Sequence, residues 1–112
     1  MINAGKLRHR IAIQRKTVEK NTYGEEVVVF VDRIQTWASI EPLSGREYYQ
    51  ANQTQSSVDH RISMRYQSGI QTYDRVKFKS GETVRYFDIL SVINLEERNI
   101  TLELMCKEFT SP

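Results

Sequence analysis

The clearest pattern of apolar and polar positions along the chain lies in residues 57–66, SVDHRISMRY. One set of alternate positions in this stretch is mostly apolar and consists of Val58, His60, Ile62, Met64 and Tyr66. The other set is polar or charged and consists of Asp59, Arg61, Ser63 and Arg65. Because a strand turns successive side chains to opposite faces, this alternation predicts a strand over residues 58–66 with one buried and one exposed face.

Similar alternation, or a run of β-branched residues, predicts further strands. They cover residues 9–15, 26–32, 36–43, 73–79, 83–94 and 100–107. The run EVVVFVD at 26–32 has no polar face, which predicts a strand that is buried on both faces or bent across the sheet. The strand at 36–43 should end at Pro42, which lacks the amide donor that a central ladder needs. The segment 83–94 is long enough for one bent strand or for two strands joined at a bulge.

Glycine and polar residues indicate where the strands connect. Residues 16–21 are polar and lead into a glycine turn at 22–25. Residues 80–81, Ser-Gly, have the composition of a two-residue hairpin connection. A second tight turn is predicted at residues 96–99.

One stretch departs from the strand pattern. Ser44 and Glu47 have the spacing of a capping box, which predicts a short helix over residues 45–53. The polar residues 52–57 that follow are predicted to form a loop before the next strand. The chain is therefore expected to be all-β, a small antiparallel β-barrel (or sandwich) of about six or seven short strands with one short helix or loop insertion. Its 112 residues suffice for a single domain, 1–112.

Composition narrows the class of protein. The formal net charge of +2 does not by itself indicate a nucleic-acid binder. The single cysteine cannot form an internal disulfide, which fits a reducing compartment. No apolar run approaches the roughly 20 residues that span a bilayer, and the N-terminus lacks the apolar core of a secretion signal. We expect a cytoplasmic protein without membrane association.

The residues that could carry chemistry are few. His9 and His60 are not spaced like metal ligands, and both lie on the apolar parity of predicted strands, so they are expected to be packed. Cys106 follows Leu102 and Leu104 on an inward parity and is expected to be a core residue. The paired glutamates of the chain lie at predicted turns. We therefore predict no enzyme activity, no catalytic residue, no cofactor and no metal.

Basic and aromatic residues leave one alternative open, an OB-like module that binds single-stranded nucleic acid. The residues that could form such a surface are Arg61, Arg65, Arg75, Lys77, Lys79 and Arg85, with Tyr66, Tyr73, Tyr86 and Phe87. Acidic residues interleave with them, so cross-strand ion pairing explains the same pattern.

Two segments in the first half of the chain resemble conserved patterns of tailed-phage head–tail joining proteins. Residues 5–14, GKLRHRIAIQ, resemble the family's G-x-L-R-x-R-I-x-I-Q opening. Residues 37–47, WASIEPLSGRE, resemble its W-A-x-I-x-P-L-x-G-x-E segment.

The resemblance continues in order through the second half. Residues 60–66 are similar to the family's H-x-I-x-[apolar]-R-Y strand, although Asp59 stands where many members have threonine. Residues 74–76 and 86–89 match its D-R-V and Y-x-I strands, and residues 102–108, LELMCKE, match its L-x-L-x-C-x-E ending.

This resemblance implies a head-completion, or head-closure, protein of a siphovirus-like phage or prophage. Such a protein is a small β-barrel that assembles as a ring, expected to be dodecameric, below the portal and adaptor proteins. It would extend or close the channel through which packaged double-stranded DNA passes, and would offer the attachment surface for a tail terminator or tail-completion protein. The implied location is the neck of the virion, reached after assembly in the host cytoplasm.

Two sets of residues are candidates for these contacts. The first, a channel or interface loop within residues 44–57, consists of Gly45, Arg46, Glu47, Tyr48, Tyr49, Gln50, Asn52, Gln53 and Gln55. The second, a subunit or adaptor interface, consists of Arg8, Arg10, Arg61 and Arg65.

Overall fold

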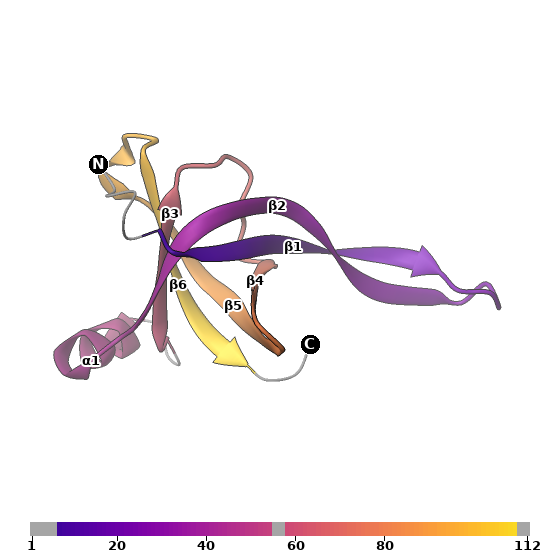
Figure 1. The fold of residues 1–112 in the computed structure, drawn as a ribbon, viewed down its shortest axis with the longest axis horizontal. Helices are drawn as coiled ribbons and strands as arrows, with labels where there is room; N and C mark the ends of the chain where they lie inside the picture. The colour runs from indigo at the N-terminus through magenta and orange to yellow at the C-terminus, as the bar shows by residue number, and fades with distance from the viewer. Residues whose placement is uncertain (1–6, 55–57, 110–112) are drawn as a thin grey trace.

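The computed structural model describes residues 7–54 and 58–109, in which six antiparallel strands are joined with one α-helix (Figure 1). The strands are β1 His9–Lys20, β2 Glu26–Pro42, β3 His60–Arg65, β4 Asp74–Ser80, β5 Thr83–Asn94 and β6 Thr101–Phe109. The helix α1 covers Gly45–Thr54, and a short 3-10 turn covers Leu95–Glu97.

The strands close on themselves in the order β1-β2-β3-β6-β5-β4, with β4 pairing back to β1. Each strand is antiparallel to both of its neighbours. Closure pairs the edges that an open sheet of this size would expose. The predicted all-β class and small antiparallel barrel are confirmed.

Inward-facing side chains from every strand fill the barrel. The fully buried apolar residues include Ile11, Ile13, Ala38, Ile62, Met64, Val76, Phe87, Leu104 and Cys106. Ile62 and Met64 belong to the alternating stretch at 58–66, so the predicted inward face of that strand is confirmed. Burying side chains of this size stabilises the fold by about 1.5–3 kcal/mol each.

The first hairpin differs most from the sequence-based prediction. The polar residues 16–20 were expected to be a connection, yet they continue β1 and pair with residues 26–30. The two strands predicted at 26–32 and 36–43 form one continuous strand, β2. The register shifts where Ile13 pairs with Ile34 and Gln14 pairs with Asp32, which leaves Arg33 as the extra residue of a bulge.

The prediction that residues 26–32 are buried on both faces is wrong. Val28 and Val31 are 54% and 41% exposed, because β1 pairs with β4 only as far as Arg15 and the barrel ends there. Residues 16–31 therefore leave the barrel as a free two-stranded hairpin, which we call the arm. Figure 1 shows the arm extending along the long axis of the molecule, which measures 50 × 31 × 28 Å.

The remaining connections largely follow the sequence. The predicted short helix is confirmed as α1, which takes in residues 52–54 of the expected loop; residues 55–57 lie outside the described residues. The irregularity expected within residues 83–94 is confirmed as a register shift between Ile89 and Ser91. The β4–β5 turn was placed one residue too early: Ser80 pairs with Thr83, so the turn consists of Gly81, at φ +61°, and Glu82.

Candidate functional site

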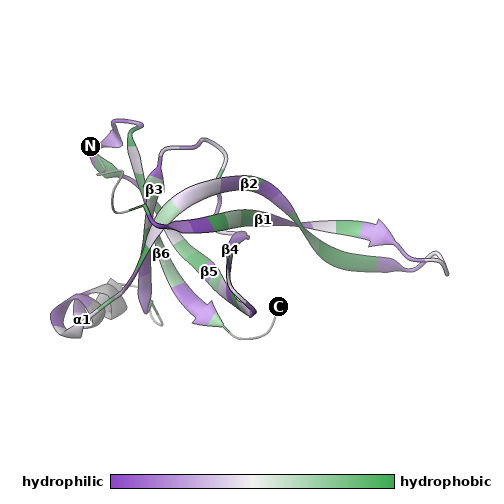
Figure 2. Cartoon of the chain, viewed as in Figure 1, coloured by the Kyte–Doolittle hydropathy of each residue, from purple (hydrophilic) through white to green (hydrophobic). Residues whose placement is uncertain are grey.

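The arm exposes apolar side chains on both of its faces. Cross-strand neighbours share a face, so Val18 and Val28 form one exposed pair, whereas Val27 and Val31 lie on the opposite face. Figure 2 shows apolar segments along the arm as well as in the barrel. Exposed apolar side chains that cluster on a surface are typical of interaction sites, and a two-stranded ribbon in water is only marginally stable alone. The arm is therefore a candidate interaction surface.

Local hydrogen bonds shape the tip of the arm. The Asn21 side-chain Oδ1 accepts hydrogen bonds from the backbone N–H groups of Tyr23 and Glu25, at 2.9 and 3.0 Å. Gly24 has φ +78°, a conformation that favours glycine, and its N–H donates to the Asn21 carbonyl at 3.0 Å. These bonds hold Tyr23 outward, where it is 86% exposed.

A buried carboxylate holds the base of the arm. The Asp74 side chain is fully buried and accepts hydrogen bonds from Arg15 Nε at 2.7 Å and Arg15 Nη2 at 3.0 Å. Its Oδ2 also accepts the Gln71 backbone N–H at 2.9 Å, and lies 3.7 Å from Nη1 of the bulge residue Arg33. The guanidinium groups of Arg15 and Arg33 both donate to the Gly69 carbonyl. The hydrogen bonds that Arg15 donates to Asp74 raise the pKa of Arg15, which stays charged.

A second set of contacts ties the opposite face of the arm to the barrel. Gln14 donates from Nε2 to Asp32 at 2.7 Å and accepts from Arg75 Nε at 2.8 Å. The Arg75 guanidinium lies between the rings of Phe30 and Tyr86, with its carbon 3.6 and 4.5 Å from their centroids. Burial lowers the pKa of Arg75. Both sets of contacts lie beside the bulge, so they fix the direction in which the arm leaves the barrel.

A pocket of about 370 Å³ lies on the outer surface of the barrel. It is lined by Leu7, Thr36, Trp37 and Arg65. Trp37 is 49% exposed, and the guanidinium carbon of Arg10 lies 5.6 Å from its ring centroid. An exposed tryptophan flanked by arginines has the composition of an interface hot spot.

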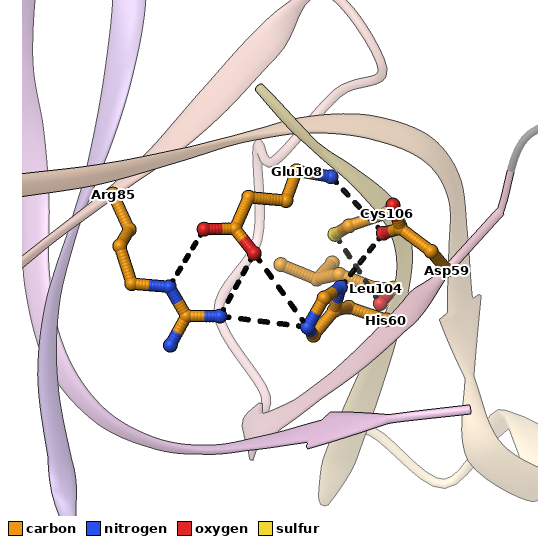
Figure 3. A network of polar contacts seen from close by, with 6 residues as sticks. All are labelled: Asp59, His60, Arg85, Leu104, Cys106 and Glu108. Carbon is orange, nitrogen blue, oxygen red and sulfur yellow. Dashed lines mark hydrogen bonds and ion pairs between the residues drawn. The ribbon is translucent and has the colours of Figure 1, made fainter. Parts of the chain in front are cut away.

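His60, one of the residues considered for chemistry, lies in a network of polar contacts (Figure 3). His60 Nδ1 lies 2.7 Å from Asp59 Oδ1, and that oxygen also accepts the Glu108 backbone N–H at 3.0 Å. Arg85 donates to both carboxylate oxygens of Glu108, at 2.7 and 3.0 Å, which lowers the pKa of Glu108. The His60 ring packs edge-on against Phe87, and the His9 ring packs edge-on against Phe78, so the prediction of packed histidines is confirmed.

Cys106 lies next to this network. Its side chain is fully buried, its Sγ donates to the Leu104 carbonyl at 3.4 Å, and burial raises the pKa of the thiol. The prediction that Cys106 is a core residue is confirmed. Within residues 7–54 and 58–109, no group of three or more His, Cys, Asp or Glu side chains is placed to hold a metal ion, and no helix is long and apolar enough to cross a membrane.

Three of the arginines considered for an OB-like nucleic-acid surface are engaged within the subunit. Arg61 pairs with Glu47 and Glu41, Arg85 pairs with Glu108, and the buried Arg75 packs between aromatic rings. Ion pairing with acidic residues, as the interleaved pattern predicted, accounts for Arg61 and Arg85.

Comparison with known proteins identifies the family to which this chain belongs. A family model described as phage head completion protein matches residues 2–108 of the chain. The chain belongs to the phage head completion protein family. The match begins before β1 and ends one residue short of the end of β6, and the family assignment made from the sequence motifs is confirmed.

A solved structure is similar to this head completion protein over nearly its whole length. The solution structure of protein SF1141 from Shigella flexneri 2a is 26% identical, with a TM-score of 0.76, and the match covers 99% of this chain and 100% of that one. No curated protein sequence matches the chain.

The two sets of candidate contact residues of this head completion protein lie in different places. Gly45, Arg46, Glu47, Tyr49 and Gln50 are exposed on α1; Tyr48, Asn52 and Gln53 belong to the same helix, and Gln55 lies outside the described residues. Arg10 and Arg65 lie at the Trp37 pocket, whereas Arg61 lies beside α1 and pairs with Glu47. Arg8 is exposed and precedes β1. Their role as a subunit or adaptor interface stays a prediction.

Sequence reasoning missed the projecting arm of this head completion protein. A signal was present: residues 16–20, KTVEK, alternate in the same way as a strand and precede a glycine turn and a valine run. It also missed Trp37 as an exposed residue, since tryptophan is more often largely buried.

Proposed function

We propose that this chain is a structural ring component of the virion neck in a siphovirus-like phage or prophage. Copies of the chain assemble below the portal and adaptor, expected as a dodecamer. The ring extends or closes the channel for packaged double-stranded DNA and presents the surface to which a tail terminator or tail-completion protein attaches. Assembly takes place in the host cytoplasm, and the role requires no cofactor or catalytic residue.

The observation that carries this proposal is the projecting arm. An isolated subunit leaves apolar residues on both faces of the arm in water, among them Val18, Val27, Val28 and Val31. A subunit of a closed ring needs two different surfaces, because each copy contacts its two neighbours through unlike patches. The arm supplies one such surface at a distance from the barrel.

The helix α1 supports a contact with another ring or with the channel. Figure 1 shows α1 and the tip of the arm at opposite ends of the long axis. The ion pair between Arg61 Nη1 and Glu47 Oε2, at 2.8 Å, ties the start of the helix to β3, and the exposed Arg46, Tyr49 and Gln50 remain accessible. We propose that α1 faces the channel or the adjacent ring.

Electron microscopy of the protein mixed with its own portal and adaptor tests the proposal. The wild-type chain is expected to add a ring of density below the adaptor. A variant in which residues 18–28 are replaced by Asn-Gly keeps the pair Thr17–Val29 and closes it with a favoured hairpin turn. This variant should fold, because residues beyond Arg15 pair only within the arm, but it should add no ring.

The matched control is Glu82→Gln, an exposed residue of the β4–β5 turn, which should add a ring like the wild type. The proposal fails if the wild-type chain adds no density to the portal–adaptor complex. It also fails if the isolated monomer instead binds short single-stranded oligonucleotides with a steep salt dependence.

A further inference from the structure

The tip of the arm carries acidic side chains without ionic partners. Among the described residues, no basic group lies within ion-pair distance of Glu19, Glu25 or Glu26, although most arginines of the barrel are paired. Lys20 is the only basic residue between positions 19 and 26, so the tip has an excess of negative charge. The exposed ring of Tyr23 lies within this acidic tip.

The Trp37 pocket has the opposite charge to the acidic tip. Arg65 lines it and Arg10 lies over the Trp37 ring, and no carboxylate of residues 7–54 or 58–109 lies within ion-pair distance of either arginine. Leu7 and Trp37 provide apolar surface between the two charges. The pocket is therefore suited to a ligand that combines an aromatic or apolar group with negative charge.

We propose that the tip of the arm of one copy docks in the Trp37 pocket of the next copy. This inference rests on the proposed self-assembly and names the contact that joins neighbouring subunits. Tyr23 packs against Trp37 and Leu7, and the carboxylates of Glu25 and Glu26 pair with Arg65 and Arg10. The proposal follows from complementary charge and from the aromatic and arginine content typical of interface hot spots.

The geometry of β2 makes this contact intermolecular. Trp37 and Glu26 lie on the same continuous strand, and the strand rises about 3.3 Å per residue, which separates the tip from its own pocket by about 35 Å. The tip therefore reaches the pocket of another copy and not its own. The contact joins two unlike surfaces, so it repeats around an axis until the ring closes.

Charge reversal tests the contact. The tip variant Glu25→Arg/Glu26→Arg and the pocket variant Arg10→Glu/Arg65→Glu each place like charges across the proposed interface. Each variant alone should lose ring formation on the portal–adaptor complex by more than about tenfold, equivalent to about 1.4 kcal/mol. An equal mixture should recover it, because the tip and pocket of the two variants are then complementary in both directions. The matched control is Glu82→Arg/Lys107→Glu, at two exposed residues that do not line the pocket, which should assemble like the wild type.

Cross-linking gives a second measurement that does not depend on a loss of assembly. Glu25→Cys/Arg65→Cys introduces one thiol at the tip and one at the pocket, while the buried Cys106 is shielded. With a short bis-maleimide, assemblies on the portal–adaptor complex should give a ladder of covalent multimers. The control Glu25→Cys/Glu82→Cys should give none, because Glu82 is exposed but does not line the pocket.

Three outcomes would overturn the inference while leaving the proposed ring intact. One is a wild-type ring with no multimers from Glu25→Cys/Arg65→Cys. Another is a tip thiol that cross-links only to the adaptor. The third is a charge-reversed mixture that assembles no better than either variant alone. Absence of a wild-type ring would instead overturn the proposed function.

Discussion

Arg15 and Asp74 form a bidentate ion pair at the point where the arm leaves the barrel. Arg15 Nε lies 2.7 Å from Asp74 Oδ1, and Arg15 Nη2 lies 3.0 Å from Asp74 Oδ2. Arg15 is the last residue of β1 that pairs with β4, and Asp74 is the first residue of β4. The pair therefore joins the base of the arm to the last paired residues of the barrel. Because the Asp74 side chain has no exposure to water, its charge depends on these donors.

The first prediction concerns this pair. In Asp74→Asn, the side-chain NH2 group would replace either Oδ1 or Oδ2. It would then face Arg15 Nε at the first position, or Arg15 Nη2 and the Gln71 N–H at the second, so at least one hydrogen bond is replaced by a repulsive contact. We expect faster amide hydrogen exchange throughout residues 16–31 and a lower melting temperature. Hydrogen exchange followed by mass spectrometry measures the first effect. The control Glu96→Gln disrupts an exposed ion pair with Arg98 and should change neither quantity appreciably.

The second prediction compares the contributions of the barrel and of the arm to the free energy of unfolding. Leu104 is fully buried in the barrel, so Leu104→Ala should lower the free energy of unfolding by about 2–5 kcal/mol. Val28 lies on the arm and is 54% exposed, so Val28→Ala should change it by less than about 0.5 kcal/mol. Urea denaturation of the isolated protein measures both. Equal losses for the two variants would mean that the arm is packed in the isolated subunit.

The third prediction concerns acid stability. The hydrogen bond from Arg85 lowers the pKa of Glu108 in the folded state below its unfolded value of about 4.3. The pair therefore contributes stability above the unfolded pKa, and this contribution is lost as the pH falls through the folded pKa.

Glu108→Gln should consequently be less stable than the wild type by about 1 kcal/mol at pH 7, with a difference that shrinks towards zero in acid. Urea denaturation at a series of pH values from 7 to 3 provides the measurement. Glu82→Gln, which removes a carboxylate with no ionic partner among the described residues, should show no such trend. A difference between Glu108→Gln and wild type that is independent of pH would contradict the assignment.

The fourth prediction concerns Cys106. Burial raises the pKa of its thiol, and the thiolate is the reactive form of cysteine. The native protein should therefore react with a thiol-specific reagent at pH 8 only as fast as it unfolds, and addition of urea should accelerate labelling sharply. The variant Glu82→Cys, which adds an exposed thiol to the buried Cys106, provides the control for reagent activity. Rapid labelling of native wild-type protein would show that this strand opens.

Period-two alternation was sufficient to predict the barrel strands from sequence. His60, Ile62 and Met64 all turn inward on β3, and Leu102, Leu104 and Cys106 do so on β6, because the side chains of any strand must alternate. The short helix was predictable for a comparable local reason, the spacing of Ser44 and Glu47. The turn at 80–82 was misplaced by one residue, since a serine–glycine pair does not by itself fix the register of the flanking strands.

The arm was not predictable in the same way. A run such as VVVFV predicts a strand but says nothing of what covers it, and a buried strand and an unpartnered ribbon have the same local preferences. The exposure of Val28 depends on where β4 stops pairing with β1, which is set by contacts between residues about 60 positions apart, such as Arg15 and Asp74.

The sequence by itself determined the all-β class, the inward face of each barrel strand, the helix and the family. These follow from local periodicity and from motifs that need no knowledge of the third dimension. Only the tertiary structure decided that β1 and β2 extend beyond the barrel. It also decided that Trp37 lies exposed beside arginines that have no ionic partner among the described residues, and that His60 is held in a polar network. The physical reason is that the exposure and pairing of a side chain depend on which distant segments pack together. Closure of the sheet into a barrel determines these contacts for all six strands.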